Sequence, residues 1–229
     1  MLILLRHGQS IYNAKNIFTG WVNIGLSQKG KQETKKAALL LKKAGVVVDL
    51  AFTSKLKRAK QTLGIILKDM GLKPLIKETF ALNERHYGAL QGKNKNQVLK
   101  QYGPKKFFAF RRSWAIKPPA LKNQRKDQPS TESLKDTWAR TQPYFKQEIL
   151  PQIEQGKNVL ISAHGSTIRV LVKYFDGLSV KEVEKLNIPC GFPLVYEFNK
   201  NLQPIKKYYL GNPKEIAKTI KKVSNEGVK

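Results

Sequence analysis

A histidine between an arginine and a glycine follows the first apolar segment of the chain, as Arg6-His7-Gly8 after Leu2–Leu5. Four aliphatic residues in a row predict a strand that is buried on both faces. An imidazole nitrogen at the end of such a strand can attack phosphorus, and a neighbouring guanidinium can hold phosphate oxygens. Gly8 permits a close backbone turn there. The residues indicate phosphoryl chemistry, although an ordinary strand end with a surface histidine would look the same.

The same arrangement occurs a second time, where the apolar segment Val159–Ala163 is followed by His164-Gly165. The chain has three histidines, and two of them stand at these matching strand ends. Parallel strands place their carboxyl ends along one edge of the sheet, where α/β proteins bind ligands. We therefore expect the two imidazoles to flank a single pocket.

Arg58 is a further candidate for this edge. The segment 46–53 predicts another buried strand, and a helix with an apolar stripe follows it. Arg58 lies off that stripe in the first turn of the helix, where a positive helix end and an arginine both suit an anion. A solvated surface arginine would show the same pattern.

Several longer segments extend these observations. They are Phe18-Thr19-Gly20-Trp21, the run from Asn83 to Gly92, Arg111-Arg112-Ser113, Thr131-Glu132-Ser133-Leu134, and Asn187-Ile188-Pro189 through Tyr209-Leu210-Gly211. Together with the two His-Gly pairs, they make the chain resemble the cofactor-dependent phosphoglycerate mutases, a branch of the histidine phosphatase superfamily. The resemblance covers nearly the whole chain and is most specific from Glu84 to Gly92.

The resemblance implies a set of catalytic residues. His7 would be the nucleophile that carries a phosphoryl group as phosphohistidine. Arg6, Arg58 and His164 would supply positive charge to the phosphoryl oxygens, with His164 preferred as the imidazolium. Glu84 would move protons to and from the substrate hydroxyls.

A second set of residues matches the binding positions of the family. They are Gly8, Gln9, Ser10, Asn13, Thr19, Gly20, Arg85, His86, Tyr87, Lys95, Arg111, Arg112, Gly165 and Ser166. The adjacent Arg111 and Arg112 suit the far end of an acid that carries more than one negative group. The chain departs from the family at Tyr12, where tryptophan is usual, and at Ser166, where asparagine is common.

The formal net charge of +27 also fits a nucleic-acid-binding protein. However, the lysines are scattered along every segment, and arginine, the usual reader of base edges, is scarce. We therefore expect no nucleic-acid partner. We also expect no membrane partner, because no apolar run is long enough to span a bilayer. The single cysteine, Cys190, cannot form an internal disulfide and favours the reducing cytoplasm.

The elements that must position these residues alternate between strand and helix. They predict an α/β fold with one domain over residues 1–229: a three-layer α/β/α sandwich whose mostly parallel central sheet ends in a late antiparallel strand. Residues 93–130 read as a helical insertion and loop, with two helices separated by Gly103-Pro104. Residues 212–229 read as a flexible, lysine-rich C-terminal tail with a thin apolar stripe.

The resemblance implies interconversion of 3-phosphoglycerate and 2-phosphoglycerate in glycolysis and gluconeogenesis, primed by 2,3-bisphosphoglycerate. No metal-ligand motif is apparent, so we expect no metal cofactor. The alternatives are a broad phosphatase of the same superfamily and a basic binding protein on this scaffold. A phosphorylated small acid is the expected substrate. A homodimer is retained as the expected assembly, although the loop 121–129 is shorter than in longer bacterial members.

Overall fold

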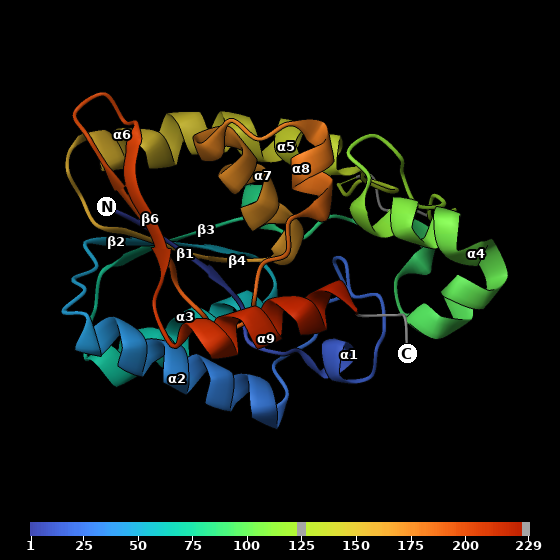
Figure 1. Ribbon diagram of the computed structural model, residues 1–229, viewed down its shortest axis with the longest axis horizontal. Helices are drawn as coiled ribbons and strands as arrows, with labels where there is room; N and C mark the ends of the chain where they lie inside the picture. Colours follow the sequence, from blue (N-terminus) through green and yellow to red (C-terminus); the bar gives the residue numbers. More distant parts are fainter. Residues whose placement is uncertain (123–126, 226–229) are drawn as a thin grey trace.

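The computed structural model describes residues 1–122 and 127–225, and these contain a central six-stranded sheet (Figure 1). The strand order is β3-β2-β4-β1-β5-β6. The strands are β1 Leu2–Arg6, β2 Leu50–Ser54, β3 Leu75–Thr79, β4 Val159–Ala163, β5 Leu194–Phe198 and β6 Pro204–Tyr209. Strands β1 to β4 run parallel, whereas β5 is antiparallel to β1, and β6 to β5. The prediction of a mostly parallel sheet with late antiparallel pairing is confirmed.

The central strands are buried on both faces because their alternate side chains enter two separate cores. Leu2 and Leu4 of β1 pack with one cluster, and Ile3 and Leu5 pack with the other. Strand β4 pairs with β1 over its whole length, with Arg6 opposite Ala163 in the register. This register brings His7 and His164, the residues that follow the two strands, to the same edge of the sheet.

Helices cover both faces of the sheet, which confirms the three-layer sandwich (Figure 1). One face is covered by α2 Gln28–Lys43 and α3 Lys57–Met70. The other is covered by α5 Leu134–Tyr144, α6 Leu150–Glu154 and α7 Gly165–Asp176. The remaining helices are α1 Ile11–Ala14, α4 Lys95–Arg112, α8 Val180–Lys185 and α9 Pro213–Ser224. Single 3-10 turns span Phe80–Leu82 and Gly88–Leu90.

The predicted insertion forms a small lobe beside the sandwich (Figure 1). Its helix α4 contains Gly103 at φ +73°, followed by Pro104, so two helical segments meet at a kink as expected. Phe107 and Phe110 pack on Phe18 and Leu90 in a separate hydrophobic cluster. The insertion is thereby fixed against the segment that contains Thr19 and Gly20. Residues 123–126 of the predicted loop lie outside the described residues.

Two predicted elements differ in extent from the structure. The strand expected from residue 46 begins at Leu50, because residues 46–49 form the connection from α2. The segment from Thr131 to Ile153, whose pattern predicts mainly helix, is divided by a π-helical turn, Phe145–Ile149. Pro151 lies at the start of α6, where it cannot donate the backbone hydrogen bond that a continuous α-helix requires.

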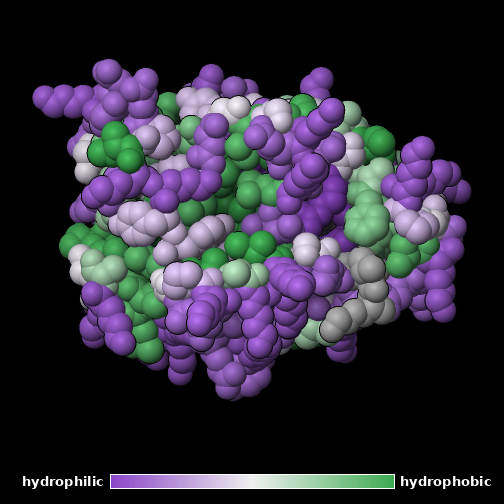
Figure 2. Space-filling model, viewed as in Figure 1, coloured by the Kyte–Doolittle hydropathy of each residue, from purple (hydrophilic) through white to green (hydrophobic). Residues whose placement is uncertain are grey.

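The chain has 43 lysine and arginine residues, which predict a hydrophilic surface. Hydrophilic residues cover most of the face seen in Figure 2, including α2. Within the described residues, no helix is long and apolar enough to cross a membrane.

Gly8 and Gly30 allow helix α2 to approach the segment that follows β1. A Cβ on Gly30 would lie 2.0 Å from the carbonyl oxygen of Gln9, and a Cβ on Gly8 would lie 2.2 Å from that of Gly30. Both neighbours are backbone atoms, which cannot rotate away as a flexible side chain could. The close approach therefore depends on glycine at both positions.

We expect Gly30→Ala to lower the free energy of unfolding by about 1–3 kcal/mol, because the added methyl group forces backbone apart. Gly64→Ala is the matched control, because Gly64 is also helical and a Cβ there meets no atom within 4 Å. The control should be neutral or stabilising by up to about 1 kcal/mol. Urea unfolding of both variants measures the difference, and equal effects would contradict the steric account.

Candidate active site

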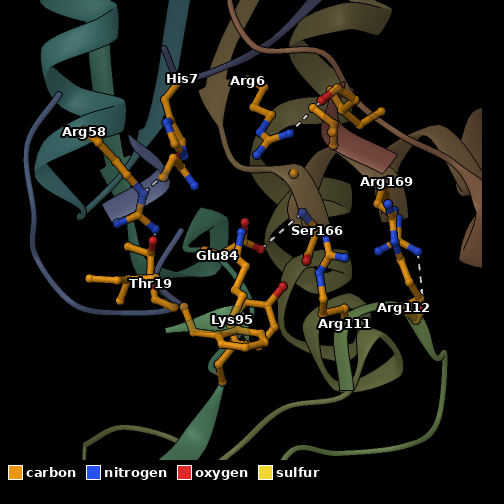
Figure 3. Close-up of a pocket in the computed structure, with 18 of the residues that line it drawn as sticks. Arg6, His7, Thr19, Arg58, Glu84, Lys95, Arg111, Arg112, Ser166 and Arg169 are labelled. Carbon is orange, nitrogen blue, oxygen red and sulfur yellow. Dashed lines mark hydrogen bonds between the residues drawn. The ribbon is translucent and has the colours of Figure 1, made fainter. Parts of the chain in front are cut away.

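A pocket opens at the carboxyl ends of β1 and β4 (Figure 3). Thirteen of the predicted site residues line it: Arg6, His7, Asn13, Thr19, Gly20, Arg58, Glu84, Tyr87, Lys95, Arg111, Arg112, Gly165 and Ser166. Figure 3 shows His7, Arg58 and Arg6 at one end of the pocket and Lys95, Arg111 and Arg112 at the other. Glu84 lies between the two groups.

The hydrogen bonds of His7 fix which of its ring nitrogens carries the proton. Its Nδ1 lies 2.7 Å from the carbonyl oxygen of Gly8. A carbonyl oxygen only accepts hydrogen bonds, so the proton is assigned to Nδ1. The lone pair is then on Nε2, which accepts a hydrogen bond of 3.1 Å from Nε of Arg58. His7 thus presents a nucleophilic nitrogen beside a guanidinium.

Arg58 is held by backbone oxygens of the loop that also contains Thr19. Its two terminal nitrogens donate to the carbonyl oxygens of Gly20 at 2.8 Å and Val22 at 3.1 Å. Burial lowers the pKa of Arg58 to about 10, with a smaller lowering from Arg6, whereas Glu84 raises it. The guanidinium therefore remains protonated at neutral pH.

His164 is fully buried next to the nucleophile, with its ring centroid 5.0 Å from that of His7. Its Nε2 lies 2.7 Å from the hydroxyl oxygen of Ser54, and its buried Nδ1 has no hydrogen-bond partner among the described residues. Burial, followed by the charges of Arg58, His7 and Arg6, holds the pKa of His164 well below its usual range. The protein alone therefore favours neutral His164, and the expected imidazolium requires a nearby anion.

Glu84 is oriented by two backbone N–H groups. Its Oε1 accepts hydrogen bonds from the N–H of Arg85 at 2.8 Å and of Ser166 at 3.1 Å. The contact with Ser166 uses the main chain, so serine in place of the common asparagine preserves it. The other oxygen, Oε2, lies 3.8 Å from where a Cβ on Gly165 would be, and the guanidinium carbon of Arg6 lies 3.6 Å from that position. The carboxylate and the Arg6 guanidinium therefore share the space that opens over Gly165.

Arg169 is a pocket residue that the sequence analysis did not identify. It is 4% exposed and donates to carbonyl oxygens of Val183, Glu184 and Arg112, so it joins α7 to α8 and to the end of α4. Burial, followed by the charges of Arg112 and Arg85, lowers its pKa to about 9. One feature of the sequence could have identified it: an arginine inside the otherwise apolar run 168–172 indicates a buried, hydrogen-bonded guanidinium.

The charge of the pocket is strongly positive. Its described lining includes the cationic side chains of Arg6, Arg58, Lys95, Arg111, Arg112 and Arg169, against the single carboxylate of Glu84. The positive groups occupy both ends of the pocket (Figure 3). Such an arrangement suits a small molecule with two or more negative groups.

Six predicted site residues support the pocket from behind instead of lining it: Gly8, Gln9, Ser10, Arg85, His86 and His164. Gly8 has no side chain and so lets α2 pack closely against the segment after β1. The N–H of Gln9 donates to Glu33 at 2.8 Å. Ser10 caps helix α1 and donates its hydroxyl to the amide oxygen of Asn13 at 2.8 Å.

Arg85 and His86 contact residues next to the pocket instead of the pocket itself. Arg85 is fully buried, donates to the carbonyl oxygen of Arg111 and lies over the ring of Tyr87, 4.8 Å from its centroid. The N–H of His86 donates to Glu132 at 2.9 Å, and its Nδ1 accepts from the N–H of Gly88. Burial is the main cause that lowers the pKa of His86. Direct substrate contact by His86 is not supported by this position, because its ring is engaged in the turn.

Helix α9 reaches the pocket from the C-terminal side. Val223 lines the pocket and is 9% exposed, and Ile216 is also buried. Lys36 of α2 and Glu215 of α9 form an exposed ion pair of 2.5 Å. The tail is therefore helical and docked over the site, and its last residues, 226–229, lie outside the described residues. Among the described residues, no group of three or more His, Cys, Asp or Glu could hold a metal ion.

Comparison with known proteins agrees with this arrangement. A model of the histidine phosphatase superfamily (branch 1) matches residues 2–209. The chain is 47% identical to a 2,3-bisphosphoglycerate-dependent phosphoglycerate mutase of Borreliella burgdorferi, over 99% of this chain and 98% of that protein. It is 46% identical to a protein of the same description from Treponema denticola, over 100% and 99% of the two chains.

Among solved structures, the fold is similar to a mycobacterial glucosyl-3-phosphoglycerate phosphatase in complex with vanadate. The TM-score is 0.70 at 25% identity, and the match covers 91% of this chain and 96% of that chain.

Proposed function

Because the chain belongs to the histidine phosphatase superfamily, we propose that it interconverts 3-phosphoglycerate and 2-phosphoglycerate through a phosphohistidine at His7. The reaction belongs to glycolysis and gluconeogenesis. The observation that carries the proposal is the spacing of charge in the pocket: a histidine nucleophile at one end, an arginine cluster at the other and a carboxylate between them (Figure 3). This arrangement supports a substrate with one transferable phosphoryl group and a second anionic end.

His7 divides the reaction into two displacements at phosphorus. In one, Nε2 of His7 forms a bond to phosphorus while the bond from phosphorus to a substrate oxygen breaks. In the other, the second hydroxyl oxygen attacks the same phosphorus and the bond to Nε2 breaks. Arg6 and Arg58 would neutralise the phosphoryl oxygens throughout, and His164 would join them as an imidazolium once that anionic group lies nearby.

Glu84 moves the proton in each step. It would donate a proton to the substrate oxygen that leaves phosphorus and remove one from the hydroxyl that attacks it. The N–H groups of Arg85 and Ser166 hold Oε1, and so direct the carboxylate to the substrate oxygens. At the far end, Arg111, Arg112 and Lys95 would bind the carboxylate and remaining phosphate of the acid.

The residues also fit 2,3-bisphosphoglycerate, whose three anionic groups suit a pocket with positive groups at both ends. Thr19 adds a buried hydroxyl oxygen, which has no hydrogen-bond partner among the described residues. When bound, this compound supplies the phosphoryl group that primes His7. The chemistry needs no metal ion in this scheme, because arginines provide the positive charge.

A broad phosphatase of the same superfamily is the second candidate, and the likeness in fold to a solved phosphatase favours it. The two activities differ in whether water reaches phosphohistidine. Val223 of α9 covers part of the pocket and would restrict entry of water, which favours the mutase. The arginines of the insertion favour it as well, because they suit the second anionic end of a bisphosphorylated intermediate.

The central experiment follows conversion of 3-phosphoglycerate to 2-phosphoglycerate, with and without trace 2,3-bisphosphoglycerate and with a chelator present. We expect turnover that depends on the bisphosphate and persists with the chelator. Incubation with labelled bisphosphate should place acid-labile, base-stable label on the wild type and none on His7→Ala. Release of inorganic phosphate without isomerisation would instead identify a phosphatase, and label on His7→Ala would exclude His7 as the nucleophile.

For the tail, we expect deletion from Asn212 onward to leave phosphorylation of His7 largely intact. Mutase turnover should fall and the hydrolysed fraction should rise, because the cover over the pocket is lost. The measurement is the ratio of isomerised to hydrolysed product. Lys36→Ala is the control, because it removes an exposed ion pair to α9 and a contact with the Phe192 ring but leaves the helix in place. An unchanged ratio at unchanged turnover in the truncated protein would mean that the tail has no role in the reaction.

We further propose a cytoplasmic homodimer. Strand β3 is an edge of the sheet, and Leu75, Ile76 and Phe80 are 66%, 45% and 59% exposed there. Pairing of this edge with a second copy would cover them. Light scattering should give the mass of a dimer for the wild type and of a monomer for Ile76→Lys. Ile205→Lys, on β6 at the opposite edge, should remain dimeric. A monomeric wild type would contradict this assembly.

A further inference from the structure

Arg140 of helix α5 makes an extensive hydrogen-bond network behind the pocket, and the proposed chemistry does not use it. Its guanidinium forms a two-point ion pair with Glu132, at 2.8 Å to Oε1 and 3.0 Å to Oε2. The side chains of both residues are largely buried, at 11% and 4% exposure. Arg140 does not line the pocket, so direct contact with substrate is not its role.

The remaining donors of Arg140 bind the segment that leads to Glu84. One terminal nitrogen donates to the carbonyl oxygens of Phe80 and Ala81, at 2.8 and 2.9 Å. The other donates to those of Asn83 and Glu84, at 3.2 and 3.4 Å. A single guanidinium therefore holds four carbonyl oxygens within five consecutive residues.

Glu132 and Trp21, which both contact Arg140, make further hydrogen bonds to the main chain at and after Glu84. Glu132 accepts a hydrogen bond of 2.9 Å from the N–H of His86, two residues after Glu84. The indole of Trp21 lies under the Arg140 guanidinium, 5.4 Å away, and donates to the carbonyl oxygen of Glu84 at 2.5 Å. The main chain of Glu84 is thus fixed before, at and after the residue, while its carboxylate points into the pocket.

We propose that Arg140 is a positioning residue for the acid/base carboxylate of Glu84, an inference that rests on the proposed function. A planar fork with five N–H donors can meet both Glu132 oxygens and the four carbonyl oxygens at once, with one N–H of the second terminal nitrogen shared between two acceptors. Because the carboxylate must meet two different substrate oxygens, small displacements of its main chain are costly to turnover. A lysine would keep the charge and the ion pair but could not hold the same set of oxygens.

The test compares Arg140→Lys and Arg140→Gln with the wild type in the mutase assay. We expect kcat to fall by roughly 10- to 100-fold in both, since misplacement of a catalytic group costs up to about 10². KM for the monophosphoglycerate should change by less than about threefold, because the arginines at the far end of the pocket are untouched. Tyr196→Phe controls for a general loss of stability. Tyr196 lies on β5, away from the pocket, and the change removes its hydrogen bond to Asp176 at the end of α7. It should leave kcat unchanged.

A double-mutant comparison separates positioning from general support of the fold. Glu84→Gln should lower turnover by roughly 10²–10⁴, and adding Arg140→Lys should lower it by no more than about twofold further. A full additional loss in the double variant would show that Arg140 acts independently of Glu84 and would overturn the inference. The Lys variant retains the ion pair, and it keeps the test decisive if the Gln variant does not fold.

The outcomes distinguish failure of this inference from failure of the proposed function. If Glu84→Gln lowers turnover but Arg140→Lys does not, only the positioning role is excluded. Near-normal turnover of Glu84→Gln would remove the acid/base role of Glu84 and this inference together.

Discussion

The guanidinium groups of four arginines that line the pocket are held by backbone carbonyl oxygens. Arg6 donates to Ile188, Arg58 to Gly20 and Val22, Arg112 to Leu186 and Arg169 to Val183. A carbonyl oxygen accepts a hydrogen bond and carries no net charge, so these bonds orient a guanidinium without neutralising it. The positive charge thus remains available to an anion in the pocket.

Burial lowers the pKa values of two of these guanidinium groups. Burial lowers the pKa of Arg58 to about 10 and that of Arg169 to about 9, because the charged form loses contact with water. Arginine tolerates this lowering at neutral pH, since its ordinary pKa is so high. Lysine begins about two units lower and would lose its proton more readily at such positions.

The pocket is built from two kinds of element: central strands that place the histidines, and helix α9 at the pocket edge. His7 and His164 follow two paired central strands, whose register sets the histidines side by side. Arg140 of α5 donates to the main-chain carbonyl oxygen of Glu84, and the N–H of Ser166 at the start of α7 donates to its carboxylate. In contrast, the cover comes from α9, which is attached through few buried residues and one exposed ion pair. The two histidines therefore lie on the central sheet, whereas α9 packs at the edge of the pocket.

The sequence by itself determined the local features of the fold. The strands β1 and β4 follow from their apolar runs, and Ser27, whose position predicts a helix N-cap, caps the helix that begins after it. It also determined most of the pocket lining, because the motif residues follow the strands or lie in segments with family-specific patterns. These signals are short-range, and a few neighbouring residues suffice to produce them.

Only the tertiary structure decided how distant residues meet. The place of Arg140 at the main chain of Glu84, and of Arg169 between α4 and α8, depends on contacts between segments far apart in the chain. The need for glycine at residue 8 comes from the packing of α2, whereas the sequence predicted a close backbone turn that presents the imidazole of His7. Likewise, the neutral state favoured for His164 follows from burial among cations, since desolvation is set by everything that surrounds a group and not by its neighbours in sequence.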